Sequence, residues 1–326
     1  MKKTIKRYVL PLIGVIIFIV FLRHVPSRDI LLRLRDIGLV NIIILLTLTS
    51  ADLFLKSIRW KLLISKTTSI KIPLFFSFKT ILAGIASGSI IPGRVELTRP
   101  LMLKANYEIP LASSIPALTT ERIMDLISLL FIMIASALLI SSTKNIVFLS
   151  PAIISMIVLG VLGILIIAFY PHWLLLAQKT LNSIFRARIF EKIKIRGALN
   201  YFFDSYIQSI SKLKKSYISS MTIFSCIING IEIIRFYFLL QMLGIDASLA
   251  ATGFAFTASI IIGIATMIPG GVGVTEVSAS QIITSMTPTA TKGIVASAIL
   301  LERVIAYYLL VILGALILTF SVKSER

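Results

Sequence analysis

The stretch Ile91–Pro100 (IPGRVELTRP) places charged side chains next to a helix break, between two apolar runs. Its Pro-Gly pair breaks any helix that enters it. Each of Arg94, Glu96 and Arg99 would cost about 2.5–3.5 kcal/mol at the centre of an isolated membrane helix. An arginine fork can bind two phosphate oxygens at once. The pattern predicts an anion site in which Arg94 and Arg99 bind a phosphate and Glu96 lies beside them.

A second break, Ile268–Glu276 (IPGGVGVTE), occurs late in the chain. Glycines allow a ligand to approach the backbone closely, and the free N–H groups at a helix start bind anions. We expect helices to start near Val95 and Val272 and to approach the membrane interior from opposite sides. The two breaks would then form one headgroup site. The second break contributes Gly270, Gly271, Gly273 and Glu276 to it.

Further charged residues lie inside long apolar runs, where they need partners or a function. Asp52, Lys56 and Arg59 share one helical stripe and can pair with one another. Arg122 with Asp125, and Glu232 with Arg235, have the spacing of three that also allows pairing. Glu302 and Arg303 have no charged residue three or four positions away and need partners elsewhere. The candidates for coupling or interhelical ion pairs are Arg59, Glu121, Arg122, Asp125, Arg235, Glu302 and Arg303.

Three roles are open for these residues. In the first, Arg94, Glu96 and Arg99 pair with Glu276, Glu302 and Arg303 and hold two halves of the protein together. In the second, they bind a substrate. In the third, Glu121, Glu276 and Glu302 carry protons.

Composition places these residues in a membrane protein. The chain has 326 residues, 57% of them hydrophobic, and a mean hydropathy of +0.98. This predicts an all-α polytopic membrane protein. The net charge of +19 indicates basic loops on the cytoplasmic side that attract anionic lipid. It does not indicate nucleic-acid binding, since no basic domain is separate from the apolar runs. One cysteine and two histidines favour neither a disulfide nor a metal site, and we expect no cofactor.

The apolar runs predict both full spans and shorter segments. Ser27–Ile37 reads as an amphipathic surface helix that ends before Gly38. Pro73–Tyr107 and Leu249–Met286 contain the two breaks, and we expect them to be re-entrant hairpins, which are tolerated where they line a cavity or lie within protein. The predicted spans are Tyr8–Val25, Leu39–Ile64, Leu111–Ile140, Val147–Tyr170, Tyr217–Leu243 and Gly293–Val322.

Landmarks recur in constant order along the chain. Arg59 matches Arg235, the Pro-Gly pairs match, and Glu121-Arg122 matches Glu302-Arg303, at offsets of 176, 177 and 181 residues. We predict one membrane domain, with a first span and surface helix (1–38), repeat one (39–141), a connecting span with a basic loop (142–216) and repeat two (217–322). Basic residues place both termini in the cytoplasm. The repeats would then have inverted topology, a pattern typical of secondary transporters.

The motifs resemble those of a known family. They are Arg59–Leu63 (RWKLL), Pro92–Arg99 (PGRVELTR), Glu121–Asp125 (ERIMD) and Pro269–Glu276 (PGGVGVTE). Together they resemble the membrane domain of lysylphosphatidylglycerol synthases, in its free-standing, flippase-like form, over nearly the whole chain. The resemblance implies lipid translocation. It gives no support for lysyl transfer, because we expect the soluble transferase domain to be absent.

The sequence therefore favours a plasma-membrane translocator for an anionic phospholipid or a polyprenyl-phosphate lipid. Two alternatives stay open: a lipid-modifying transferase, and a membrane partner of a cell-envelope glycosyltransferase. Assembly into a homo-oligomer is also open. We find no catalytic motif.

Overall fold

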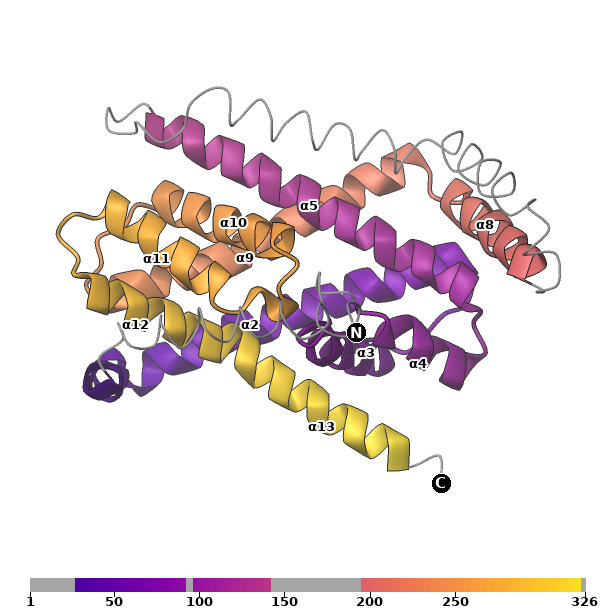
Figure 1. Cartoon of the computed structure of the whole chain (residues 1–326), viewed down its shortest axis with the longest axis horizontal. Coiled ribbons are helices and arrows are strands. Elements are labelled where there is room, and N and C mark those ends of the chain that lie inside the picture. Colours follow the sequence, from indigo (N-terminus) through magenta and orange to yellow (C-terminus); the bar gives the residue numbers. More distant parts are fainter. Residues whose placement is uncertain (1–26, 92–95, 142–194, 324–326) are drawn as a thin grey trace, which may run out of the picture.

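The computed structural model describes residues 27–91, 96–141 and 195–323, and all regular structure in these ranges is helical (Figure 1). This confirms the all-α prediction. The predicted spans Tyr8–Val25 and Val147–Tyr170, and Arg94, lie outside the described residues. The elements are α2 (Ser27–Thr68), α3 (Leu74–Gly88), α4 (Thr98–Tyr107), α5 (Leu111–Ser141), α8 (Ile195–Ser211), α9 (Lys215–Met242), α10 (Leu249–Ala265), η2 (Pro269–Gly271), α11 (Val274–Met286), α12 (Lys292–Arg303), η3 (Val304–Tyr308) and α13 (Leu309–Lys323).

Four helical segments of the described chain are long and apolar enough to cross a membrane, which confirms a multi-pass membrane protein. They are Ile37–Thr68, Leu111–Ile140, Ser216–Met242 and Lys292–Phe320. The last comprises α12, η3 and most of α13. Each matches a predicted span to within a few residues. The 15-residue α3 and the 17-residue α10 are short for a crossing at 1.5 Å per residue. Their re-entrant course stays a prediction.

Gly38 lies at the start of the first of these spans, Ile37–Thr68. Gly38 has φ +76° and ψ 155°, a conformation that residues with a side chain rarely adopt. It divides α2 into two helices, at the boundary expected from the sequence. The longer part then runs without a break to Thr68.

The two halves have the same order of helices: a long helix, a short helix, a break, a second short helix and a long span. In the first half these are α2, α3, α4 and α5. In the second half they are α9, α10 and α11, followed by the continuous segment from α12 to α13.

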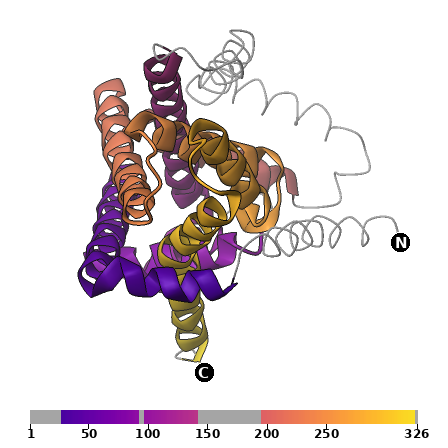
Figure 2. The ribbon, with the colours of Figure 1, turned by 90° about the vertical axis from the view of Figure 1, so that its left-hand side faces the viewer.

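The packing between the halves has the same correspondence. The short helix α3 packs against the last span of the other half, at α13, and α10 packs against α5. The two opening helices, α2 and α9, pack against each other. This arrangement can be followed in Figure 1 and, from the side, in Figure 2. It fits the predicted repeat, while the inverted orientation in the membrane stays a prediction.

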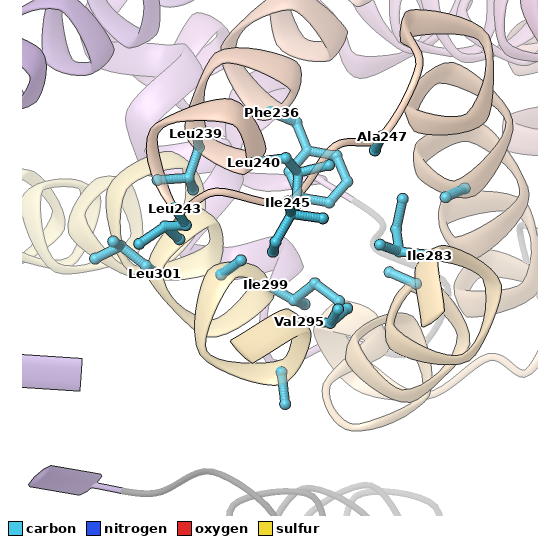
Figure 3. Close-up of a cluster of buried hydrophobic side chains, with 14 of the residues drawn as sticks. Phe236, Leu239, Leu240, Leu243, Ile245, Ala247, Ile283, Val295, Ile299 and Leu301 are labelled. Carbon is cyan, nitrogen blue, oxygen red and sulfur yellow. The ribbon is translucent and has the colours of Figure 1, made fainter. Parts of the chain in front are cut away.

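Two apolar cores surround the region where the halves meet. One joins α9 to α11 and α12 through side chains such as Phe236, Ile283 and Ile299 (Figure 3). The other joins α2 to α3, α4 and α5 around Trp60 and Leu103. Packing of this kind holds helices together in a membrane, where lipid is as apolar as the side chains.

Candidate functional site

Arg59 of α2 is buried between two carboxylates of α5. Its side chain is only 1% exposed. One nitrogen lies 2.9 Å from Glu121 Oε1 and 3.1 Å from Asp125 Oδ2. The other nitrogen bonds to Asp125 and, at 2.6 Å, to Ser225 Oγ of α9. The Arg122–Asp125 pair that the spacing allows does not form, because Asp125 pairs with Arg59 of another helix.

Arg99, at the start of α4, is buried and pairs with two carboxylates through its terminal nitrogens. It donates to Glu96 Oε2 at 2.9 Å and to Glu121 Oε2 at 2.7 Å. Its guanidinium stacks over the Trp60 ring, 3.8 Å from the ring centre. Glu96 also forms an ion pair with Arg122 of α5. The first break is thus tied to the last span of its own half.

Corresponding pairs occur in the second half. Arg235 of α9 donates to Glu302 Oε1 of α12, at 3.1 Å and 2.8 Å, as Arg59 donates to Glu121. Arg303 Nε lies 2.7 Å from Glu276 Oε1, as Arg122 pairs with Glu96. The prediction that Glu302 and Arg303 need distant partners is confirmed.

Glu276 also fixes the start of α11. Its second oxygen accepts the backbone N–H of Gly273 at 2.7 Å, and Tyr308 Oη lies 3.4 Å from the first. Gly270 and Gly271 have φ of +64°. A Cβ at Gly270 would lie 2.5 Å from Tyr307 Oη, so the backbone of the break approaches the last span closely.

The ion pair between the halves is not the one expected. Lys56 of α2 donates to Glu232 Oε1 of α9 at 2.6 Å and to Asp52 Oδ2 at 2.9 Å. The expected Glu232–Arg235 pair is wrong. The lock between the two breaks was one of three open roles, and its described members do not form it, because Glu96, Arg99 and Glu276 pair within their own halves. Each break lies against the last span of its own half, within reach of that span's charges.

A cavity of about 190 Å³ lies where the two halves meet. Its wall combines apolar and aromatic side chains, such as Phe236 and Tyr307, with seven charged residues. The charged residues are Lys56, Glu96, Arg122, Glu232, Arg235, Glu302 and Arg303. The side chain of Arg122 is 44% exposed, although it belongs to the span Leu111–Ile140.

The last span changes its winding beside this cavity. Val304–Tyr308 forms a π-helical turn directly after Glu302 and Arg303, and its Ala306 and Tyr307 line the cavity. Single π-helical turns inside helices are frequent at functional sites.

The cavity gathers part of the predicted site. Of the predicted residues, Glu96, Arg122, Arg235, Glu302 and Arg303 line it. The others among the described residues lie behind them, as partners or in the second break: Arg59, Arg99, Glu121, Asp125, Gly270, Gly271, Gly273 and Glu276. Lys56 and Glu232 line the cavity but were not assigned to the site. The signal that could have found them is their separation of 176 residues, which equals that of Arg59 and Arg235.

Electrostatics keep the first break charged. Burial favours the neutral form of Glu96, but the guanidiniums of Arg122 and Arg99 hold the pKa of its carboxyl below the usual value. Within the described residues, no three Asp, Glu, His or Cys side chains lie close enough to hold a metal ion. The geometry offers a cavity much larger than a single water, with both cations and carboxylates in its wall.

Comparison with known proteins supports a common family over nearly the whole chain. The family described as the lysylphosphatidylglycerol synthase TM region matches residues 8–314. A UPF0104 membrane protein of Pyrococcus horikoshii is 24% identical, with 96% of each chain covered. A UPF0104 membrane protein of Methanothermobacter thermautotrophicus is 23% identical, with 98% of each chain covered.

Proposed function

Because the chain belongs to the family of the lysylphosphatidylglycerol synthase transmembrane region, we propose that it translocates an anionic lipid. The headgroup would pass through the cavity between the halves while the acyl or polyprenyl tails stay in the bilayer. The substrate would be a phospholipid or a polyprenyl-phosphate lipid.

The observation that carries this proposal is a cavity with seven charged wall residues among helices long enough to span a membrane. Ionisable residues at membrane depth are costly and commonly mark a substrate or ion path. Buried ion pairs alone would hold the helices together without any cavity. Here the wall offers both cations and carboxylates to a polar group that leaves water.

We assign the phosphate to Arg122 and Arg303. They are equivalent in the two halves, each follows a glutamate of the last span, and each pairs with a glutamate of its own break. Arg122 is the more exposed of the two, at 44% against 12% of the side chain, so it has donors left for a ligand. A guanidinium suits phosphate because its planar fork bonds two oxygens.

The breaks keep a proposed role in this scheme. Arg94 and the glycines Gly270, Gly271 and Gly273 would contact the headgroup during its passage. An inverted relation of the halves would let each break open toward one leaflet in turn. This part of the proposal includes cytoplasmic termini and a location in the plasma membrane.

The test is headgroup transfer by purified protein in vesicles. Proteoliposomes would contain phosphatidylglycerol labelled with a fluorophore on an acyl chain, and a membrane-impermeant reagent would quench the outer leaflet. We expect wild-type protein to expose inner-leaflet label faster than empty vesicles do. Arg122→Gln should slow this at least tenfold, and Arg122→Lys should retain part of the rate because it keeps the charge but not the fork.

Lys292→Gln is the matched control, since Lys292 is exposed at the start of α12 and does not line the cavity. Equal rates for Arg122→Gln and Lys292→Gln would refute the assignment of Arg122. A wild-type rate no higher than that of empty vesicles, with both phosphatidylglycerol and a polyprenyl phosphate, would refute translocation. Covalent change of the lipid in detergent micelles would point to the transferase alternative, because translocation has no meaning there.

A further inference from the structure

The ion pairs of the described residues fall into groups with different charge balance. Arg59, Arg99 and Arg122 face the three carboxylates Glu96, Glu121 and Asp125. Arg303 faces Glu276. Both groups are balanced. The group beside them is not: its two cations, Lys56 and Arg235, face three carboxylates, those of Asp52, Glu232 and Glu302.

This excess negative charge lies at membrane depth, and Asp52 is the member of the group that is nearly fully buried and does not line the cavity. Asp52 is close to the middle of the span Ile37–Thr68, and its side chain is 3% exposed. The Lys56, Glu232 and Glu302 side chains are 23%, 15% and 8% exposed. A buried carboxylate without a full counter-charge costs several kcal/mol, and such a group binds a cation or takes up a proton.

We propose that Asp52 binds a proton and that this proton completes the charge balance of the group. Asp52 Oδ1 is buried and has no hydrogen-bond partner among the described residues, so within them this carboxylate lacks part of its compensation. The charged groups around Asp52 are Lys56 on its own helix and Glu232 and Arg235 on α9. From α12, Glu302 reaches the group through Arg235.

The other two carboxylates are better compensated. Glu302 Oε1 accepts two N–H groups from Arg235, although its Oε2 is also buried without a partner. Glu232 holds the shorter bond to Lys56, 2.6 Å against 2.9 Å for Asp52. We assign a proton and not a multivalent metal ion, since no three Asp, Glu, His or Cys side chains of the described chain lie close enough to hold one.

The proton would control the contact between the halves. With Asp52 neutral, the Lys56 ammonium forms an ion pair with Glu232 alone, and this bridge between α2 and α9 is strong. With Asp52 charged, the ammonium is shared and the bridge weakens. Coupling of this step to lipid movement rests on the proposed function, whereas the proton site itself does not.

The test is infrared spectroscopy of the purified full-length protein in lipid nanodiscs over a pH series. A protonated carboxylic acid has a C=O stretching band that a carboxylate lacks. We expect this band at neutral pH in the wild type, a shift on labelling with ¹³C-aspartate, and loss in Asp52→Asn. Asn is neutral and of equal size, so it replaces the protonated acid without a change of charge. Asp246→Asn is the control, because Asp246 is exposed, and it should keep the band.

The ¹³C-aspartate shift is measured on the wild-type protein. This part of the test therefore does not depend on whether Asp52→Asn folds. Absence of the band at neutral pH would overturn the proposal, as would a band that ¹³C-aspartate does not shift. A band lost in Glu302→Gln but kept in Asp52→Asn would overturn the assignment to Asp52. Stability that rises with Na⁺ at constant pH, without an acid band, would show a metal cation in place of the proton. A positive band with no lipid transfer in vesicles would refute translocation and leave the proton site intact.

Discussion

Gly84→Ala should destabilise the protein through the ion pairs of the first break. A Cβ built on Gly84 of α3 lies 2.6 Å from Arg99 Cδ and 2.8 Å from Glu96 Oε2. Carbon atoms in contact normally lie about 3.5–4.0 Å apart, so Arg99 would have to move by about 1 Å.

Arg99 cannot make this movement freely. Its hydrogen bonds to Glu96 and Glu121 measure 2.9 Å and 2.7 Å, and the Trp60 ring covers one face. Overpacking of a core costs about 1–3 kcal/mol, and loss of one hydrogen bond to a charged group costs about 1.5–3 kcal/mol. These costs sum to about 2.5–6 kcal/mol, and alanine in helix α3 recovers about 1 kcal/mol, so we expect Gly84→Ala to lose about 1.5–5 kcal/mol of unfolding free energy.

Gly230→Ala is the matched control, because Gly230 lies inside helix α9 and a Cβ there meets no atom within 4 Å. Alanine favours a helix over glycine by about 1 kcal/mol, so the control should be neutral or stabilising. Both free energies would be measured by unfolding in mixed micelles with increasing SDS. Equal stability of the two variants would refute the close packing of Gly84 on Arg99.

Two further predictions concern stability. Gly314→Ala would place a Cβ against the backbone carbonyl of Leu82. A backbone group cannot move aside as a side chain can, so the loss of unfolding free energy should reach or exceed the upper end of about 1–3 kcal/mol. An SDS midpoint equal to that of the wild type would contradict the α3–α13 contact. The folded pKa of Glu96 lies below its ordinary value of 4.5, so its contribution is complete above that pH and falls as the pH drops through the folded value. Glu96→Gln should therefore flatten the acid side of the pH–stability curve, and an unchanged slope would show that Glu96 is not held in its charged form.

The helices of the described chain were predictable because their signals are local. A long apolar run has one physical outcome in a membrane. Leu111–Ile140 was expected and found with the same ends, and Gly38 marks the start of a span as expected. The residues of the cavity were partly predictable for a similar reason: a charge inside an apolar run needs a partner.

The identity of the partners was not predictable from single helices. Spacing along a helix favoured Arg122 with Asp125, and Glu232 with Arg235, but such surface pairs contribute only about 0.2–0.5 kcal/mol. A carboxylate on another helix, approached in the dry interior, is a stronger partner. Asp125 therefore pairs with Arg59, and Arg235 with Glu302. Helix packing decides these contacts, and residue spacing within one helix does not show which other helix it packs against.

The positions of Lys56 and Glu232 limit which residue types the two halves can carry at equivalent places in their sequences. The predicted inverted repeat implies a two-fold axis between the halves, and a residue on such an axis would face its own equivalent. Lys56 and Glu232 share the 176-residue offset of Arg59 and Arg235, and they face each other at 2.6 Å. Two lysines at these positions would bring two ammonium groups into contact, out of water, where like charges repel strongly.

Opposite charges at these two positions avoid that repulsion and instead form an ion pair between α2 and α9. A search for identical residues at the repeat offset does not find such a pair, because a stable contact on the axis needs opposite charges. In a chain with a suspected internal repeat, opposite charges at the repeat offset therefore indicate residues on the axis. Lys56→Glu should weaken the contact of α2 with α9 and lower the SDS midpoint of unfolding. The added change Glu232→Lys should restore part of this loss, because it restores the pair between the helices but leaves Asp52 beside a glutamate.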